Sequence, residues 1–411
     1  MRIIFADHLL PGDASAIADA AVVVDDSDRV VAVGRAAELA PAYAALPATR
    51  IAGVVLPGLV NAHTHLELSA LAGKVPGGSG FVAWVERLIA IRPEISPESE
   101  ARAIARAVRS LVEGGTVAVG EVTNSLAAAP ALAQAGLAGS VFHEVFGWDR
   151  GRGLARLDAL AVERAERFGD GATGALRYAP SPHTLYTTHP DVVKSAFARA
   201  EALGAFASLH LAEHPAERAA IESGGGGVPE WLARRSGLPV SAIGWPNSPL
   251  FDYAAALGAL RPRVLLVHLT DATAAELARV RRSGAQVVLC PRSNLHIEGR
   301  LPPLRAMLDA GLAPALGSDS LASSDCLDVL AEAARLLAAF PEVPAWEYVK
   351  MATFNGARAL GLGDLGCIRA GMRPGLIAVE TPAVNHDAAR WLLENVGAPR
   401  RVIARAHSEP S

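Results

Sequence analysis

Short apolar runs recur along this chain, and longer stretches with the 3.6-residue periodicity of amphipathic helices separate them. Near the N-terminus, two Val-rich runs flank the polar residues 25–29, which is typical of a β-hairpin. Beyond it, strand and helix patterns alternate. Residues 96–115 and 271–284 are helical in pattern, and Asp271 is the expected cap of the second helix. The strands predicted in this repeat are residues 53–65, 116–122, 140–146, 175–183, 206–213, 264–270, 286–294 and 313–320.

Eight such repeats, with apolar strands that do not alternate with polar residues, predict a parallel sheet buried on both faces. A (β/α)8 TIM barrel closes such a sheet without leaving edges. We expect an α/β protein in which residues 56–363 form the barrel, while residues 1–55 and 364–411 together form a small β-sandwich domain. Residues 224–260 are too long and too rich in Gly, Pro and Trp for one crossover helix, and we expect an elaborated loop over the barrel.

The composition fits a large, well-buried protein. The chain has 411 residues, 51% of them hydrophobic, and a formal net charge of −4. Because no block of Lys or Arg is present, the charge argues against nucleic acid as a partner, and a small molecule is the expected substrate. The three cysteines are widely spaced, and no apolar run suits a signal peptide or a membrane span. We therefore expect a cytoplasmic protein that does not bind membranes.

Histidines and a carboxylate follow the apolar strands at one rim of the predicted barrel. His63 and His65 are two residues apart, so in a strand their imidazoles face the same way. The fifth, sixth and eighth predicted strands end in His210, His268 and Asp319. Because barrel enzymes carry their chemistry at the carboxyl ends of the strands, we expect these residues to meet around a divalent transition metal.

A catalytic metal keeps one position open for water and lowers the pKa of that water toward about 7. Hydrolysis then needs a base for the proton of the water and an acid for the leaving side of the substrate. Asp319 is the candidate base. Glu213 lies three residues beyond His210, where its carboxyl can hang beside the metal and shuttle a proton.

Five segments occur in an order that resembles one known group of enzymes: PGLVNAHTHLELS, HLAE, VHLT, CPRSNLHI and ALGSDSLAS. They resemble the amidohydrolase superfamily, in the mononuclear-metal branch that holds purine and pyrimidine deaminases and triazine hydrolases. The resemblance implies one divalent metal, zinc first and iron second, held by His63, His65, His210 and Asp319. It also implies that His268 hydrogen-bonds the attacking water and that Glu213 transfers the proton to the heteroaromatic ring.

The loops after the strands narrow the resemblance. Four segments resemble the deaminases that convert 6-amino-6-deoxyfutalosine to futalosine in menaquinone biosynthesis: LELSALAGKVPGGSGFVAWVERLIAIR, SPHTLYTT, LHLAEHPAE and LGSDSLASSDCLDVLAEAARL. We therefore expect a hydrolytic deaminase that attacks C6 of a 6-aminopurine nucleoside and releases ammonia. His183 ends the fourth strand and is a candidate hydrogen-bond partner of the substrate, while Glu67 and Glu144 are candidates for its ribose hydroxyls. A homodimer is compatible with this sequence.

Two alternatives stay open. The first keeps the machinery and changes the substrate to S-adenosylhomocysteine, methylthioadenosine, adenosine, guanine, a triazine or an amide. The second is an inactive barrel that serves as a scaffold, although such proteins usually lose metal ligands. Ammonia release from a panel of substrates separates the members of the first alternative, and metal analysis addresses the second.

Overall fold

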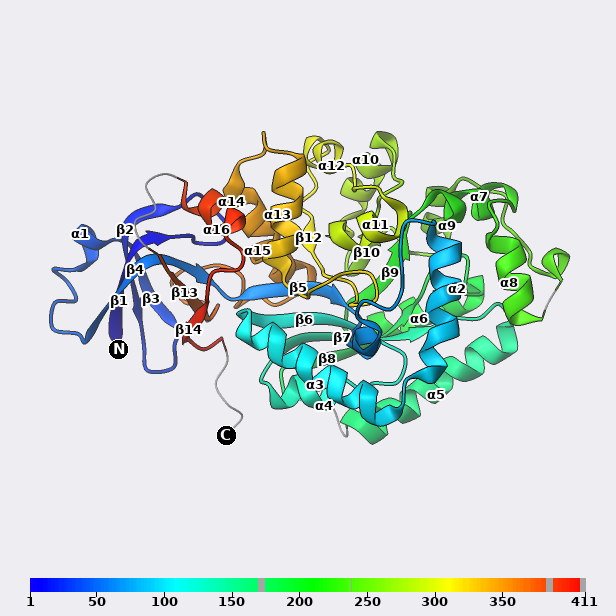
Figure 1. The fold of residues 1–411 in the computed structure, drawn as a ribbon, viewed down its shortest axis with the longest axis horizontal. Coiled ribbons are helices and arrows are strands. Elements are labelled where there is room, and N and C mark those ends of the chain that lie inside the picture. The colour runs from blue at the N-terminus through cyan, green and yellow to red at the C-terminus, as the bar shows by residue number, and fades with distance from the viewer. Residues whose placement is uncertain (169–173, 238, 382–386, 407–411) are drawn as a thin grey trace.

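The structure is a computed structural model that describes residues 1–168, 174–237, 239–381 and 387–406 (Figure 1). Residues 382–386 and 407–411 of the predicted C-terminal β segment lie outside these ranges. Within the described ranges, one six-stranded sheet lies beside two four-stranded parallel sheets, which helices surround. The predicted fold class, an α/β barrel with a small β domain from both chain ends, is confirmed. The described strands of the small domain form one six-stranded sheet, whereas the sequence pattern predicts a sandwich.

Both ends of the chain contribute strands to the six-stranded sheet, whose order is β14-β13-β4-β1-β2-β3. The central strand β4 pairs in parallel with β1 and antiparallel with β13, so it joins the first and last segments of the chain. The predicted hairpin is confirmed, because β2 and β3 pair antiparallel across residues 25–29. The strands are β1 (Arg2–Leu9), β2 (Ile17–Val24), β3 (Val30–Arg35), β4 (Ala48–Pro57), β13 (Leu376–Glu380) and β14 (Arg401–Ala404).

Residues 53–65 form parts of two strands, and the prediction of a single strand there is wrong. β4 ends at Pro57 in the small sheet, and β5 (Leu59–Thr64) begins in the barrel. Gly58 lies between them, where a Cβ atom would come within 2.4 Å of Val117 Cγ1. The apolar run continues through this point because both strands are buried, so hydrophobicity alone does not mark the change of sheet.

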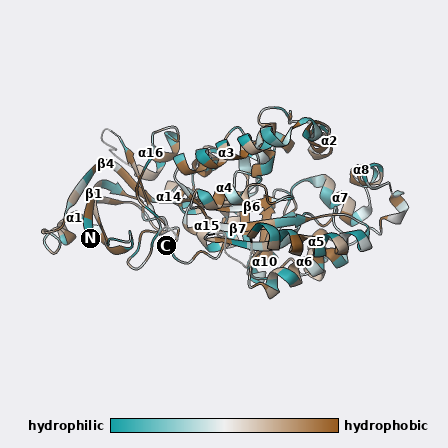
Figure 2. Cartoon of the chain, turned by 90° about the horizontal axis from the view of Figure 1, so that it is seen from below, coloured by the Kyte–Doolittle hydropathy of each residue, from teal (hydrophilic) through white to brown (hydrophobic). Residues whose placement is uncertain are grey.

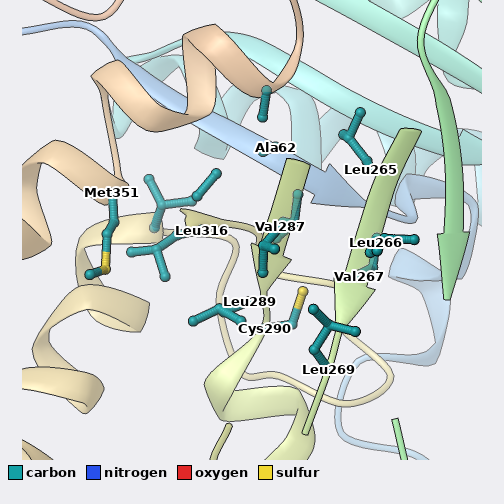
Figure 3. Close-up of a cluster of buried hydrophobic side chains, with 14 of the residues drawn as sticks. Ala62, Leu265, Leu266, Val267, Leu269, Val287, Leu289, Cys290, Leu316 and Met351 are labelled. Carbon is teal, nitrogen blue, oxygen red and sulfur yellow. The ribbon is translucent and has the colours of Figure 1, made fainter. Parts of the chain in front are cut away.

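The eight barrel strands of the described residues form two half-barrels, β5-β6-β7-β8 and β12-β11-β10-β9. The halves meet on one side where Asp319 N donates to His63 O at 3.1 Å, and on the other where His210 N donates to His183 O at 3.1 Å. Figure 3 shows the apolar side chains of β10 and β11 packed with Leu316 and Met351. The remaining barrel strands are β6 (Thr116–Thr123), β7 (Ala138–Val145), β8 (Leu176–Pro182), β9 (Ala207–Leu211), β10 (Val264–His268), β11 (Gln286–Leu289) and β12 (Ala315–Leu316).

The helices around the barrel carry hydrophilic and hydrophobic residues on different faces, as α3 and α5 show in Figure 2. The helices are α1 (Ala36–Leu39), α2 (Phe81–Ile91), α3 (Pro97–Glu113), α4 (Ala129–Gln134), α5 (Arg150–Phe168), α6 (Pro190–Ala202), α7 (Pro215–Ser223), α8 (Val228–Ser236), α9 (Leu250–Ala256), α10 (Ala274–Ser283), α11 (Pro291–Glu298), α12 (Leu304–Asp309), α13 (Val329–Ala339), α14 (Ala345–Met351), α15 (Phe354–Ala359) and α16 (Ala388–Glu394). Short 3-10 turns occupy η1 (Leu66–Leu71), η2 (Arg92–Glu94) and η3 (Val240–Ala242).

The two helices predicted in detail differ in their starting points. Ser96 caps α3, and its Oγ accepts a hydrogen bond from Ser99 N, so this helix starts where its pattern predicts. The helix predicted from residue 271 starts later, because Thr273 caps α10 through a capping box with Glu276. The prediction that Asp271 caps it is wrong, since this carboxylate instead forms an ion pair with Arg218.

The long segment 224–260 folds into α8, η3 and α9. Figures 1 and 2 both place α2 and α8 at the end of the molecule that lies away from the small sheet. No helix of the described chain has the length and apolar character needed to cross a bilayer.

Candidate active site

His63 and His65 lie at the end of β5, next to β12. The His63 side chain is fully buried, and its ring centroid is 4.9 Å from that of His65. The close approach of β12 depends on Gly317, where a Cβ atom would lie 2.6 Å from His63 Cβ. The sequence therefore brings the first pair of imidazoles against the end of the eighth barrel strand.

His210 at the end of β9 and Asp319 just after β12 complete a cluster with this pair. His65 Nε2 lies 3.3 Å from His210 Nε2 and 3.7 Å from Asp319 Oδ1, and His63 Nε2 lies 4.0 Å from the same oxygen. Two nitrogens that each bind zinc at about 2.0–2.1 Å in a tetrahedral site are separated by about the distance seen between His65 and His210.

The donor set fits a divalent transition metal. Both ring nitrogens of His63 are buried and have no hydrogen-bond partner among the described residues. Leaving such a group unpaired is costly, so it calls for a ligand. Three imidazoles and one carboxylate are a common donor set for zinc and its neighbours. These residues can therefore hold one metal ion.

Neighbouring groups orient the cluster. His210 Nδ1 donates to the carbonyl oxygen of His183 at 3.0 Å, which leaves Nε2 of His210 free of the proton and directed at the cluster. The hydroxyl of Ser293 donates to Asp319 Oδ2 and so fixes this carboxylate. Such partners hold ligands in position before an ion arrives.

Burial keeps the imidazoles neutral. It lowers the pKa of His65 and of His210 to about 4, and it lowers the pKa of His63 well below the ordinary value, with the neighbouring imidazoles adding to the effect. At neutral pH the ring nitrogens therefore keep a lone pair, which metal binding requires.

Glu213 and His268 face each other beside the cluster. His268 Nε2 lies 3.6 Å from Glu213 Oε1, and His268 Nδ1 accepts a hydrogen bond from Asn294 Nδ2 at 3.1 Å. The neutral His268 ring therefore carries its proton on Nε2, on the side of Glu213. Burial raises the pKa of the Glu213 carboxyl well above its usual range, and the nearby carboxyls of Asp319 and Glu217 raise it further. Burial and these neighbouring carboxyls therefore favour the protonated form of Glu213, in which it can donate a proton.

The backbone at these strand ends is unusual. His268 has a φ of 79° and Asp319 a φ of 56°, both in the left-handed region, and Ala212 beside Glu213 has a φ of 50°. Residues other than glycine hold this conformation at a cost, and such positions cluster at functional sites. Here the turn of the backbone directs each side chain out of its strand and toward the common cluster.

A cavity of about 220 Å³ opens above the cluster. We call the strand-end residues His63, His65, His210, His268 and Asp319 the floor. One face of α2 lines the side of the cavity, and we call these residues the wall: Phe81, Trp84, Val85, Leu88 and Ile89. Trp231 of α8 also lines the cavity, so the long segment 224–260 takes part in it.

The three candidate substrate residues all line this cavity, and their contact with substrate stays a prediction. His183 Nδ1 lies 2.8 Å from Thr187 Oγ1, and the His183 ring is 5.1 Å from that of His210. Glu144 accepts a hydrogen bond from Asn124 Nδ2 at 3.1 Å, and its other carboxylate oxygen lies 3.6 Å from His210 Nδ1.

Glu67 holds the loop that follows β6. Its carboxylate accepts hydrogen bonds from Thr123 Oγ1, Asn124 N, Ser125 N, Ser125 Oγ and Ala127 N. Burial alone would raise the pKa of Glu67, but these hydrogen bonds lower it below the usual value. Because its oxygens are already engaged, Glu67 has less capacity for ribose hydroxyls than Glu144.

Sequence reasoning assigned no role to Ser293 or Asn294, which orient Asp319 and His268. Both lie in the first turn of α11, directly after the seventh barrel strand. Their signals were that position and their place in the segment CPRSNLHI, which contributes to the family resemblance. The apolar residues of the wall gave no clear functional signal, since apolar residues at helical spacing usually face a core.

The chain is similar to several known proteins across most of its length. The amidohydrolase family matches residues 54–403. Aminodeoxyfutalosine deaminase of Deinococcus radiodurans is 31% identical over 375 residues, which cover 88% of this chain and 86% of the relative. The 5-methylthioadenosine/S-adenosylhomocysteine deaminase of Halobacterium salinarum is 32% identical over 381 residues, which cover 89% and 81%. The structure of Helicobacter pylori aminofutalosine deaminase with methylthio-coformycin has a TM-score of 0.86 at 24% identity and covers 98% of both chains.

Proposed function

This chain belongs to the amidohydrolase family as a hydrolytic deaminase, and we propose that it removes the 6-amino group of a purine nucleoside, with aminodeoxyfutalosine as the first candidate. One observation carries the proposal: three imidazoles and a carboxylate converge beside a neutral His268 and beside Glu213, whose carboxyl has a raised pKa. This arrangement supplies a metal site, a proton donor and a proton acceptor around one cavity.

We propose that a single divalent metal, zinc before iron, is held by His63, His65, His210 and Asp319. When bound, such an ion acts as a Lewis acid and lowers the pKa of a water molecule toward about 7. The proton transfers are carried out by side chains of the protein.

The proton transfers follow from the positions of three side chains. Asp319 accepts the proton of the attacking water, and Glu213 donates its proton to the ring nitrogen next to C6. His268 donates its Nε2 hydrogen to the oxygen that gains negative charge at C6. The proton held by Asp319 then passes to the amino group, the C6–N bond breaks, and the group leaves as ammonia. The oxygen from water stays as the 6-oxo group, and its remaining proton returns to Glu213.

The choice of substrate is supported by the Deinococcus radiodurans relative, an aminodeoxyfutalosine deaminase. The Halobacterium salinarum relative is almost equally similar and favours a second candidate, methylthioadenosine or S-adenosylhomocysteine. All three are 6-aminopurine nucleosides that differ only in the group at the 5′ position. The floor residues would therefore make the same contacts with the purine ring of each.

Ammonia release tests the proposal. The purified, zinc-loaded protein is assayed with aminodeoxyfutalosine, methylthioadenosine, S-adenosylhomocysteine, adenosine and guanine. We expect the highest kcat/KM for aminodeoxyfutalosine and none for guanine. The proposal fails if no 6-aminopurine nucleoside is deaminated, and a protein that also fails to retain stoichiometric zinc after loading would favour a scaffold. The homodimer stays a prediction.

A further inference from the structure

The wall connects the reaction centre to a point far along α2. Its residues recur three and four positions apart, so they form one stripe along the helix. At the near end, the Phe81 ring stacks on His214 with centroids 4.1 Å apart, and His214 adjoins Glu213. Arg92 continues the stripe just past Ile91, about 16 Å from Phe81 along the helix at about 1.5 Å per residue.

Arg92 is the one Lys or Arg among the described residues that line this cavity. Its side chain is 40% exposed, and its Nη2 lies 3.6 Å from Glu67 Oε2. This separation is longer than a hydrogen bond, and the Glu67 oxygens are already engaged by the loop after β6. A guanidinium carries five N–H donors in a planar fork. Arg92 therefore keeps donors for a ligand that enters the cavity.

The surface between these two ends is apolar. Val85, Leu88 and Ile89 lie between Phe81 and Arg92 on the stripe, and the half-exposed Phe146 lines the same cavity. An extended substituent with an apolar or aromatic body would bury surface against the wall, whereas a polar chain would lose its hydration there.

We propose that Arg92 binds a carboxylate at the far end of the 5′ substituent of the nucleoside, while the wall covers the apolar body of that substituent. The inference rests on the proposed function, and it names the part of the substrate that this enzyme selects. Arg92 forms a bidentate ion pair with the carboxylate, a geometry for which guanidinium and carboxylate are matched.

The candidate substrates differ in this feature. The 5′ arm of aminodeoxyfutalosine has an aromatic body that ends in a carboxylate. The arm of methylthioadenosine ends in a methyl group, and that of S-adenosylhomocysteine carries an ammonium beside its carboxylate. Arg92 therefore favours the first substrate over the second, and the apolar wall disfavours the ammonium of the third.

The test compares Arg92→Met with the wild type on aminodeoxyfutalosine, on its carboxylate methyl ester and on methylthioadenosine. We expect kcat/KM of the variant for the acid to fall by about 10- to 100-fold, mainly through KM, as for loss of a charged hydrogen-bonded pair. The ester and methylthioadenosine should change by less than about threefold. Arg102→Met on the exposed face of α3 removes the same charge away from the cavity and is the matched control.

Each result has a distinct meaning. Equal loss on the acid, the ester and methylthioadenosine, or no loss on the acid, overturns the role of Arg92 while the deaminase proposal stands. Wild-type protein that prefers the ester to the acid also overturns it. If the wild type deaminates none of the three, the proposed function fails and the inference fails with it. Arg92→Lys keeps the charge without the fork, and we expect it to recover only part of the preference for the acid.

Discussion

The floor and the wall of the cavity are held in place by different means. The floor residues sit at strand ends, where hydrogen bonds between neighbouring strands, such as Asp319 N to His63 O, fix the backbone. The wall belongs to α2, which lies outside the barrel and is held by the Arg234–Glu86 ion pair from α8 and by the Glu298 carboxylate at Phe81 N. Under the proposed function, the reaction and the choice of substrate would be carried by separate parts that can change independently.

Metal removal should have the largest effect, and only on the floor. Dialysis against a chelator is expected to abolish ammonia release, because the Lewis acid is lost, and added Zn²⁺ should restore it. Circular dichroism should show the helices unchanged. Full activity in protein shown by elemental analysis to be metal-free would contradict the assignment of the floor.

Glu213→Gln removes the proposed proton donor beside the floor and leaves the wall residues unchanged. We expect kcat to fall by about 10²- to 10⁴-fold, the usual contribution of a general acid, while KM changes little. Steady-state kinetics with the best nucleoside measure both constants. Glu230→Gln, an exposed position on α8, is the control. A large rise in KM with kcat intact would instead place Glu213 in substrate binding.

Glu332 is a buried carboxyl that contacts α11, the helix that carries Ser293 and Asn294. We expect it to make the stability of the protein depend on pH. Its carboxylate accepts a hydrogen bond from Arg292 N in the first turn of α11, and burial raises its pKa to about 8. Because the folded-state pKa exceeds the unfolded value of about 4.5, the folded state binds the proton more tightly, and stability falls as pH rises through this window.

Between pH 5.5 and pH 8.5, we expect the free energy of unfolding of the wild type to fall by about 2 to 3 kcal/mol more than that of Glu332→Gln. Urea titrations at the two pH values measure the difference. Glu342→Gln, which is exposed, should behave like the wild type. If Glu332→Gln keeps the whole pH dependence, another group is responsible for it.

Ile89→Ala should have the smallest effect, and it acts on the wall alone. Removing apolar contact with the substrate is expected to raise KM by up to about tenfold while kcat stays within about twofold. Ile91→Ala changes a half-buried residue of the same helix that does not line the cavity. Should both variants alter kcat rather than KM, the separation of floor and wall would not hold.

Much of the barrel and the gathering of the floor residues could be predicted from the sequence. Parallel strands that are buried on both faces appear as short apolar runs, and the first polar residue after each run falls at the same rim. His210 and His268 follow this rule directly. The structure brings them together with His63 because the carboxyl ends of the strands in a closed barrel lie at one rim. This convergence can be predicted without knowing how the side chains pack.

The orienting residues and the wall could not be predicted in the same way. Asn294 resembles an ordinary residue in a first helical turn until the backbone places it 3.1 Å from the His268 ring. The apolar stripe of α2 predicts a buried helix face but not what that face meets, which depends on how α2 folds back over the barrel. The change of sheet at Gly58 was hidden because the apolar run continues through it.

The position of β4 between β1 and β13 has a consequence for biosynthesis. During translation, the edge of β4 that pairs with β13 stays unpaired until residues 376–380 leave the ribosome. At about 5 to 20 residues per second, that delay is on the order of tens of seconds. An uncovered strand edge invites pairing with other nascent chains, so we expect the yield of this protein in a cell to depend on how well chaperones protect that edge.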